Sequence, residues 1–241
     1  MRVAVITPYF REPDAILRQC HASVRGQTHP CTHFLIADGH PNPLFSNDGA
    51  TVHIALPKPN ADNGNTPRAI GGILADQYGF DAVAYLDADN WYEPDHIANL
   101  LRARQIAGGD VIASRRRFYT LDGELLTIQD TADETNVHVD TSCWLIFRPA
   151  FALLRVWLMP KPLGPICDRI FYRAVGHHRF GFTITADRSV AFRTQYADHY
   201  THTGRPVPPG AKTDIFSAPL AYLQTVQGAK ETVQALGFYP L

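Results

Sequence analysis

Short apolar runs alternate with helical patterns through the first half of the chain. Four runs rich in small and branched apolar side chains predict buried strands, and they lie at residues 3–6, 33–37, 52–55 and 82–86. Apolar residues at helical spacing predict helices over residues 14–25, 68–77 and 94–106. The resulting order of elements, βαββαβα, is typical of a layered α/β domain.

Prolines and glycines in this half predict a loop, the start of a helix and a site of close packing. Residues 7–13 include Pro8 and Pro13, and proline is disfavoured inside a sheet, so we expect a loop there. Pro67 suits the first turn of the helix that follows it. Gly71 and Gly72 lie inside that helix and predict close packing or a close approach of a ligand.

The second half has a less regular pattern. Strands are predicted at residues 111–114, 141–147 and 190–192, and a hairpin joins 118–121 to 124–128 around an Asp-Gly turn. Helices are predicted at 151–158 and 166–175 and in the tail from 214, with a polar irregular segment at 130–139 and a loop at 193–212. We therefore expect one domain in two halves, residues 1–110 and 111–241, that share a core.

Two carboxylates follow the apolar run at residues 82–86. Asp87 and Asp89 are separated by one small residue, and in an extended backbone such residues point to the same side. Ligands of open α/β sheets bind beyond the carboxyl ends of the strands, where these side chains are expected. Two neighbouring carboxylates favour a hard divalent cation, which leaves positions open for phosphate oxygens. The alternative is a solvated turn, since Asp and Asn are common in turns.

Composition and charge narrow the range of functions. The 241 residues carry a net charge of −1, which gives no reason to expect a nucleic-acid partner. The four cysteines form no Cys-x-x-Cys pair, which fits reduced thiols in a cytoplasmic protein. The first apolar run is too short for a signal peptide, and no run reaches the ~18 residues of a transmembrane helix.

Four motifs in the first half resemble the family 2 glycosyltransferases. The opening residues 5–10 with Ser23, Gln27 and Thr28 are similar to that family's first strand, loop and helix. Residues 36–39 look like its second strand end, and residues 85–95 look like its metal and nucleotide motif. The resemblance implies a GT-A fold, layered α/β/α around a mostly parallel central sheet with a Rossmann-like nucleotide-binding half. It also implies an inverting, metal-dependent transfer of a sugar from a nucleotide donor, expected to be a UDP-sugar, to a hydroxyl acceptor.

The resemblance assigns donor-binding residues in the first half. Pro8, Tyr9 and Glu12 would line the base pocket, and Asp38 would bond to the base, where a carboxylate can accept an imide N–H. Core packing is the alternative for Tyr9. Arg68 would reach the diphosphate, unless it is only a solvated residue at the start of a helix.

The resemblance also assigns the metal site. Asp89 would bind Mn²⁺ or Mg²⁺ directly, and Asp87 would bond to the ribose or support the metal. Several enzymes of this fold place a metal-binding histidine after the last strand, which makes His199, ahead of His202, a candidate ligand.

Asp168 is the candidate general base. Residues 167–169, Cys-Asp-Arg, resemble the family's catalytic motif, although Cys167 stands where relatives often have an acid. Ala37 likewise stands where many relatives have a further acid. The alternative for Asp168 is a carboxylate that stabilises a helix N-terminus.

Other functions and partners remain open at this stage. A sugar-phosphate nucleotidyltransferase would need a glycine-rich loop after the first strand, which residues 7–13 lack, and a non-catalytic nucleotide-sugar or glycan-binding module is a further alternative. The basic residues 115–117 could hold phosphates or form an exposed strand end. The apolar residues 143–159 either form a strand and a core helix or contact a lipid-linked acceptor at a membrane surface.

Overall fold

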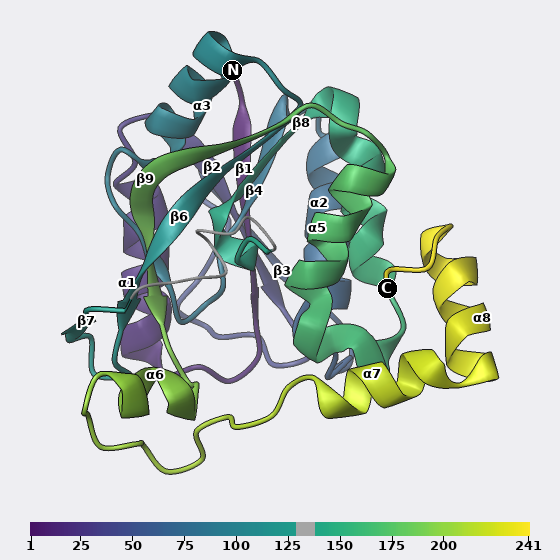
Figure 1. Cartoon of the computed structure of the whole chain (residues 1–241). Coiled ribbons are helices and arrows are strands. Elements are labelled where there is room, and N and C mark those ends of the chain that lie inside the picture. Colours follow the sequence, from purple (N-terminus) through teal and green to yellow (C-terminus); the bar gives the residue numbers. More distant parts are fainter. Residues whose placement is uncertain (129–137) are drawn as a thin grey trace.

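The computed structural model describes residues 1–128 and 138–241, and these form one large sheet covered by helices (Figure 1). The strands are β1 (Val3–Tyr9), β2 (Cys31–Ala37), β3 (Thr51–Ala55), β4 (Ala82–Tyr85), β5 (Trp91–Tyr92), β6 (Val111–Tyr119), β7 (Leu125–Leu126), β8 (Trp144–Phe147) and β9 (Phe182–Arg193). The α-helices are α1 (Asp14–Arg25), α2 (Asn65–Gln77), α3 (His96–Ala107), α5 (Cys167–His177), α6 (Ala197–His202), α7 (Ser217–Gln224) and α8 (Val226–Leu236). Three 3₁₀ segments are η1 (Thr141–Cys143), η2 (Arg148–Leu158) and η3 (Lys161–Ile166).

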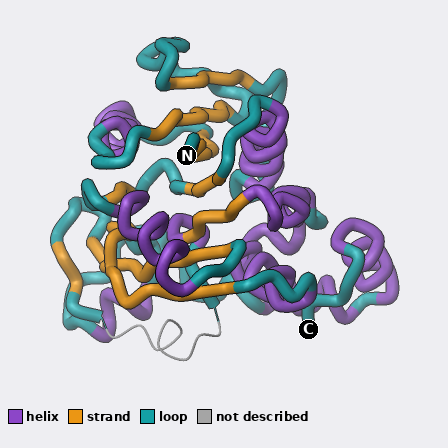
Figure 2. The backbone as a smooth tube through the Cα atoms, turned by 90° about the horizontal axis from the view of Figure 1, so that it is seen from above, coloured by secondary structure: helices purple, strands orange, loops and turns teal. Residues whose placement is uncertain are grey.

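The strands of both predicted halves belong to the same sheet, in the order β3-β2-β1-β4-β8-β6-β9-β5, with β7 paired to β6. Strands β1 to β4 pair in parallel, as expected for connections through helices. Strand β8 lies antiparallel between β4 and β6, so the sheet becomes mixed where the two halves meet. Helices cover both faces, with α2, η2 and α5 on one side and α1 and α3 on the other (Figure 2). The layered α/β architecture predicted from the pattern is therefore confirmed.

Strand β1 continues through Pro8 to Tyr9, so the predicted loop 7–13 was wrong for residues 7–9 and is confirmed for residues 10–13. The reason lies in the pairing of β1. Its neighbour β4 pairs with it only as far as Ile6, while β2 pairs with it as far as Tyr9. Pro8 therefore lies where one side of the strand has no partner, and its missing N–H costs no ladder hydrogen bond there. This extension carries Pro8 and Tyr9 to the edge where ligands of such sheets bind.

The two glycines of α2 lie against the sheet and the helix layer. A Cβ at Gly71 would stand 2.5 Å from Ile6 Cγ2, and one at Gly72 would stand 3.0 Å from the Tyr85 hydroxyl. The predicted close packing is confirmed, and it is packing against β1 and β4. Because α2 lies this close, its first turn stands directly above the ends of those two strands.

The second half differs from the prediction in several places. Residues 141–143 form η1 and not the start of a strand, and β6 continues to Tyr119, beyond the predicted 111–114. Strand β9 has 12 residues where only residues 190–192 were expected, and α6 lies inside the predicted loop 193–212. The predicted helix 151–158 is the 3₁₀ segment η2. Most side chains of residues 143–159 are buried, which supports the core interpretation of this apolar run. The predicted segment 130–139 lies mostly outside the described residues.

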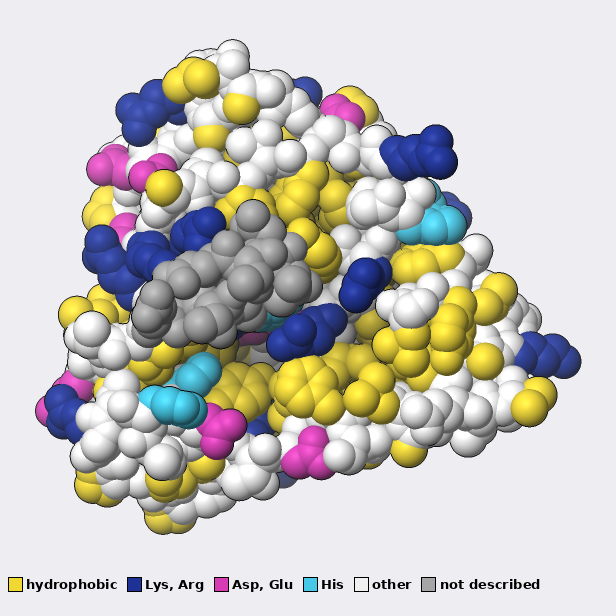
Figure 3. Space-filling model, viewed as in Figure 1, with side chains coloured by type: hydrophobic (Ala, Val, Ile, Leu, Met, Phe, Trp, Pro, Cys, Tyr) yellow, Lys and Arg dark blue, Asp and Glu magenta, His cyan; other side chains and the backbone are white. Residues whose placement is uncertain are grey.

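Apolar side chains lie along the lower right of the face in Figure 3, where Figure 1 places α7 and α8. Exposed apolar residues of this region are Phe216, Val226, Val233, Tyr239 and Leu241. Within residues 1–128 and 138–241, no helix combines the length and the hydropathy that a membrane crossing requires.

Candidate active site

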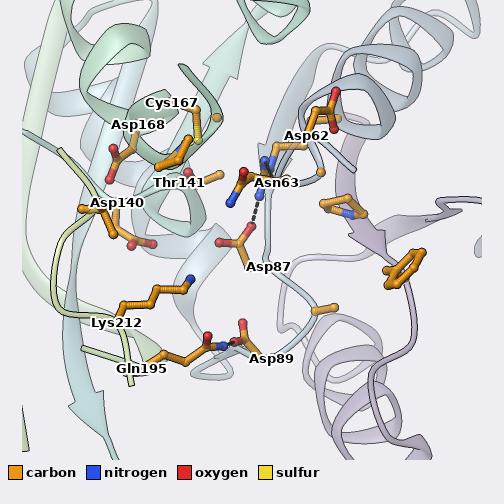
Figure 4. A pocket seen from close by; sticks show the side chains of 18 of the residues that line it. Asp62, Asn63, Asp87, Asp89, Asp140, Thr141, Cys167, Asp168, Gln195 and Lys212 are labelled. Carbon is orange, nitrogen blue, oxygen red and sulfur yellow. Dashed lines mark hydrogen bonds and ion pairs between the residues drawn. The ribbon is translucent and has the colours of Figure 1, made fainter. Parts of the chain in front are cut away.

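A cleft of about 660 Å³ opens at the carboxyl ends of β1 and β4 (Figure 4). The beginnings of α2 and α5 and the segment after β9 complete its walls. The sequence-predicted residues that line it are Pro8, Tyr9, Glu12, Asp38, Arg68, Asp87, Asp89 and Asp168. One cleft therefore unites predicted residues from Pro8 to Asp168, which are 160 positions apart in the sequence.

Arg68 and Asp87 form the tightest ion pair of the cleft. Arg68 lies in the first turn of α2, is 4% exposed, and places Nη2 2.5 Å from Asp87 Oδ1. Its Nη1 donates to the Asn63 carbonyl at 2.7 Å and to Asn65 Oδ1 at 3.0 Å. Burial alone would lower the pKa of Arg68, but the neighbouring Asp87 outweighs this and the pKa is raised. The guanidinium therefore stays charged in the first turn of α2, where it faces the cleft and could contact an anionic ligand.

Asp89 has a different environment from Asp87. Its Oδ2 accepts a hydrogen bond of 3.2 Å from Gln195 Nε2, and its backbone carbonyl accepts one of 2.6 Å from Arg193 Nη1. Burial, and next the negative charge of Asp87, raise the pKa of Asp89 to about 7. The Asp89 side chain is only partly shielded from solvent, and Arg193 lies close enough to interact with its charge, but burial and Asp87 still keep its pKa raised.

The lining of the cleft is strongly acidic. Its described carboxylates are Glu12, Asp38, Asp62, Asp87, Asp89, Asp140, Asp168 and Asp214, against the cationic side chains Arg68, Arg193 and Lys212. A diphosphate that entered this cleft alone would meet net repulsion. The oxygen donors and the raised pKa of Asp89 fit a hard divalent ion such as Mn²⁺ or Mg²⁺. Among the described residues, no group of three or more His, Cys, Asp or Glu converges on one point, so such an ion would need ligands from the diphosphate or water.

His199 lies outside the lining of the cleft. It belongs to α6, its Nδ1 is 2.7 Å from Thr194 Oγ1, and its ring packs against Phe118 with 4.8 Å between centroids. His202 Nδ1 is bound to the Asp198 carbonyl at 2.7 Å on the exposed side of the same helix. The metal role of His199 stays a prediction, and it would need α6 to approach the cleft.

The residues predicted to line the base pocket lie together in the cleft. Tyr9 is 3% exposed, its hydroxyl accepts from the Asn42 N–H at 2.7 Å, and its ring stacks on His53. Asp38 accepts hydrogen bonds from Asn60 N at 2.9 Å and Asn60 Nδ2 at 2.7 Å, and so fixes the loop before α2. The aromatic ring that is open to solvent in this part of the cleft is Phe10, which is 39% exposed. Tyr9 and Asp38 thus shape the pocket wall. The partly exposed Phe10 ring packs edge-on against His40, with 4.7 Å between centroids, and the Arg11 guanidinium lies 5.0 Å from the Phe10 centroid.

Asp168 lies in the first turn of α5 with its side chain 23% exposed. Its Oδ1 accepts from the Arg169 N–H at 2.7 Å, and its Oδ2 is 2.9 Å from His138 Nε2. Burial works to raise the pKa of Asp168, but the hydrogen bond and charge of His138 and the Arg169 N–H outweigh it, and the pKa is lowered. Asp168 is therefore ionised at neutral pH and can accept a proton.

The preceding Cys167 does not replace the acid that relatives often have there. Its side chain is buried, and burial raises the pKa of the thiol to about 12. The thiol is therefore neutral at physiological pH and adds no charge beside Asp168.

Several lining residues were missed by sequence reasoning. They are Asp62, Asn63, Asp140, Thr141, Gln195, Tyr196 and Lys212. Most lie in polar connections that carry no periodic pattern, and only the cleft brings them together. Figure 4 shows Lys212 extending toward the space between Asp140 and Asp87. The one available signal was Asp140 directly before Thr-Ser, since its side chain accepts from Ser142 N as an N-cap.

The basic run at residues 115–117 does not form a single patch. Arg116 is buried and places Nη1 2.8 Å from Asp140 Oδ2, whereas Arg117 is exposed and lies 3.7 Å from Glu93. Arg116 therefore binds Asp140, which lines the cleft, and does not itself reach the cleft to meet a phosphate.

Known proteins resemble this chain in sequence or in fold. The succinoglycan biosynthesis protein ExoW of Rhizobium meliloti (strain 1021) is 25% identical over 186 residues, which cover 64% of this chain and 57% of ExoW. TarS from S. aureus in complex with UDP-GlcNAc superposes with a TM-score of 0.64 at 13% identity, over 98% of this chain and 80% of TarS. The complex of TarS with UDP gives a TM-score of 0.59 at 12% identity, over 98% of this chain and 71% of that chain. No family model matches the chain.

These comparisons confirm the GT-A fold and the resemblance to the family 2 glycosyltransferases. The chain spans little more than half of ExoW, at 57% of its length.

Proposed function

From its GT-A fold and its likeness to family 2 glycosyltransferases, we propose that this protein is an inverting, metal-dependent glycosyltransferase. It would move a sugar from a UDP-sugar donor to a hydroxyl acceptor. The observation that carries the proposal is the composition of one cleft, in which the Arg68–Asp87 pair, Asp89 and the ionised Asp168 stand together. TarS, which shares the fold, has been solved with UDP and with UDP-GlcNAc, which supports a uridine donor.

The donor would lie along the ends of β1 and β4. We place the base between Pro8 and Phe10, against the loop that Asp38 holds. An aromatic face such as that of Phe10 can stack on a base. Asp87 would bond to the ribose, and Arg68 behind it would face the diphosphate with a planar, charged donor. Glu12 accepts from the Phe10 N–H at 2.7 Å and would fix this turn of the pocket.

Asp89 would hold the divalent ion, with Asp87 beside it. Bound there, the ion supplies positive charge that offsets the charge growing on the leaving diphosphate. Gln195 and Arg193 keep Asp89 and its loop in place from the end of β9. Ionised Asp89 is needed for this role, so protons compete with the metal around the pKa of about 7.

Asp168 would be the general base. The acceptor oxygen attacks the anomeric carbon, its bond to that carbon forms as the bond to the diphosphate oxygen breaks, and its proton passes to Asp168. A single displacement of this kind inverts the configuration at the anomeric carbon. No residue of the cleft has to form a covalent sugar intermediate.

The test is turnover of a panel of UDP-sugars with Mn²⁺ and simple glycosides as acceptors, measured as UDP release. Asp168→Asn should lower turnover at least about 100-fold and leave UDP affinity unchanged. Asp122→Asn, in an exposed hairpin turn, is the matched control and should behave as the wild type. Equal turnover in Asp168→Asn would remove the base role. Metal-dependent UDP binding with no turnover of any donor would instead favour a nucleotide-sugar-binding module.

A further inference from the structure

His138 is a buried histidine next to the cleft whose role is not explained by donor binding. Its side chain is 6% exposed, compared with 23% for Asp168. His138 is not among the residues that line the cleft, whereas Asp168 is. Of this pair, only the carboxylate can therefore meet an acceptor hydroxyl.

The hydrogen bonds of His138 define its tautomer. Nε2 is 2.9 Å from Asp168 Oδ2, and Nδ1 is buried without a hydrogen-bond partner among the described residues. Whether an imidazole carries one N–H or two, the nitrogen that has an acceptor carries a proton. His138 therefore donates from Nε2 to the carboxylate.

We propose that His138 is the positioning residue of the general base: its buried Nε2–H binds Oδ2 and holds the Asp168 carboxylate, which lines the cleft, in one orientation toward an acceptor. The inference rests on the proposed function and goes beyond it, since neither the sequence motif nor the donor site calls for a histidine here. In this chain Cys167 is neutral and gives no such support from the neighbouring position.

Two fixed donors determine the orientation of the carboxylate. The Arg169 N–H binds Oδ1 at 2.7 Å and His138 binds Oδ2 at 2.9 Å, so rotation of the carboxylate would break one of these hydrogen bonds. A base that is held in one orientation needs less reorganisation when it takes the proton. The same donors favour the charged form over the protonated form.

Other charged and titratable groups also face Asp168. They are Arg116 on β6, Asp140 before η1, Cys167 on its own helix and Tyr196 after β9. Arg116 is shared with Asp140 through their 2.8 Å ion pair, and Cys167 and Tyr196 are neutral near pH 7 because burial raises the pKa of each. His138 is thus the side chain that donates directly to Asp168, and its removal should change the Asp168 pKa more than removal of the other groups.

The experiment uses two amide substitutions that differ only in reach. The Nε2 of glutamine is four bonds from Cα, like the Nε2 of histidine, so His138→Gln can keep the hydrogen bond. Asparagine ends one bond earlier, like Nδ1, so His138→Asn cannot. The pKa of Asp168 is measured by ¹³C NMR with labelled aspartate, assigned with Asp168→Asn, beside the pH profile of kcat/KM for the UDP-sugar that the wild type turns over.

The inference predicts that His138→Asn raises the pKa of Asp168 and moves the acidic limb of kcat/KM upward by about one pH unit. At pH values below that limb, kcat/KM of His138→Asn should be about tenfold lower than that of the wild type at the same pH. UDP affinity should stay at the wild-type value. His138→Gln should remain near the wild type in both readouts. His138→Phe fills the volume of the ring but has no hydrogen-bond donor, so it should shift the Asp168 pKa upward by a similar amount. It provides the test if His138→Asn does not fold.

Two results would overturn the inference in distinguishable ways. The first result is an active wild type in which Asp168 has the same pKa as in His138→Asn and His138→Phe. That result would overturn the inference and leave the proposed function standing. A wild type that turns over no UDP-sugar would overturn the proposed function and the inference with it.

Discussion

Asp89 is a side chain whose negative charge destabilises the folded chain. Its pKa is raised by burial and by Asp87 to about 7, from an ordinary value of 3.8. A carboxyl with a raised pKa in the folded state costs stability when it ionises: the cost is absent below about pH 4 and complete above about pH 7. The proposed metal site therefore comes at a measurable loss of stability when no ion is bound.

Asp89→Asn should consequently stabilise the metal-free protein at pH 8, by roughly 2–4 kcal/mol. At pH 4 the two proteins should differ little, because Asp89 is protonated in the folded wild type. Urea unfolding at both pH values measures this, with Asp122→Asn as the exposed control. A stability difference that is the same at pH 4 and pH 8 would show that Asp89 is not a buried charge.

Arg68 is the second side chain on which the cleft depends. Arg68→Met leaves Asp87 without its partner at 2.5 Å and should cost about 2–4 kcal/mol of stability. It should also weaken UDP binding at least about tenfold, which corresponds to 1.4 kcal/mol. Arg25→Met is the matched control, because the Arg25–Asp48 pair at 3.6 Å is exposed and contributes little. Unchanged UDP affinity in Arg68→Met would remove Arg68 from the diphosphate site.

Helix α2 determines where Arg68 stands, and Gly71 determines how closely α2 packs. Gly71→Ala would place a Cβ 2.5 Å from Ile6 Cγ2. We expect a loss of about 1–3 kcal/mol of stability, and weaker UDP binding because the start of α2 moves away from β1. Gly176→Ala in α5 meets nothing within 4 Å and should stabilise by up to about 1 kcal/mol. Chemical denaturation of both variants decides this, and a neutral Gly71→Ala would mean that α2 adjusts freely.

The elements of the first half could be predicted because each follows from a local pattern. The helix 14–25 coincides with α1, and the strand ends at Asp38 and Asp87 both reach the cleft. Strand β9 could not be predicted in full, because polar residues interrupt it and its pairing with β6 contains register shifts. The contact between His138 and Asp168 was equally invisible, since a lone histidine in a polar stretch meets its partner 30 positions later only through the tertiary fold.

Taken as one body, the protein joins its first half to its second half through β8, which pairs with β4 on one side and β6 on the other. Asp87, which follows β4, and Asp168, in the first turn of α5, line the same cleft. The excess of carboxylates over cationic side chains in the lining makes the cleft a poor receptor for a free diphosphate. Nucleotide binding and divalent-ion binding should therefore depend on each other.

The most direct measurement of this claim is isothermal titration calorimetry of UDP and UDP-GlcNAc with and without Mn²⁺, on the wild type, Asp89→Asn and Asp168→Asn. We predict binding that requires Mn²⁺, is lost in Asp89→Asn and is retained in Asp168→Asn. Binding of the same strength without any divalent ion, or no metal-dependent binding of either nucleotide, would contradict the account.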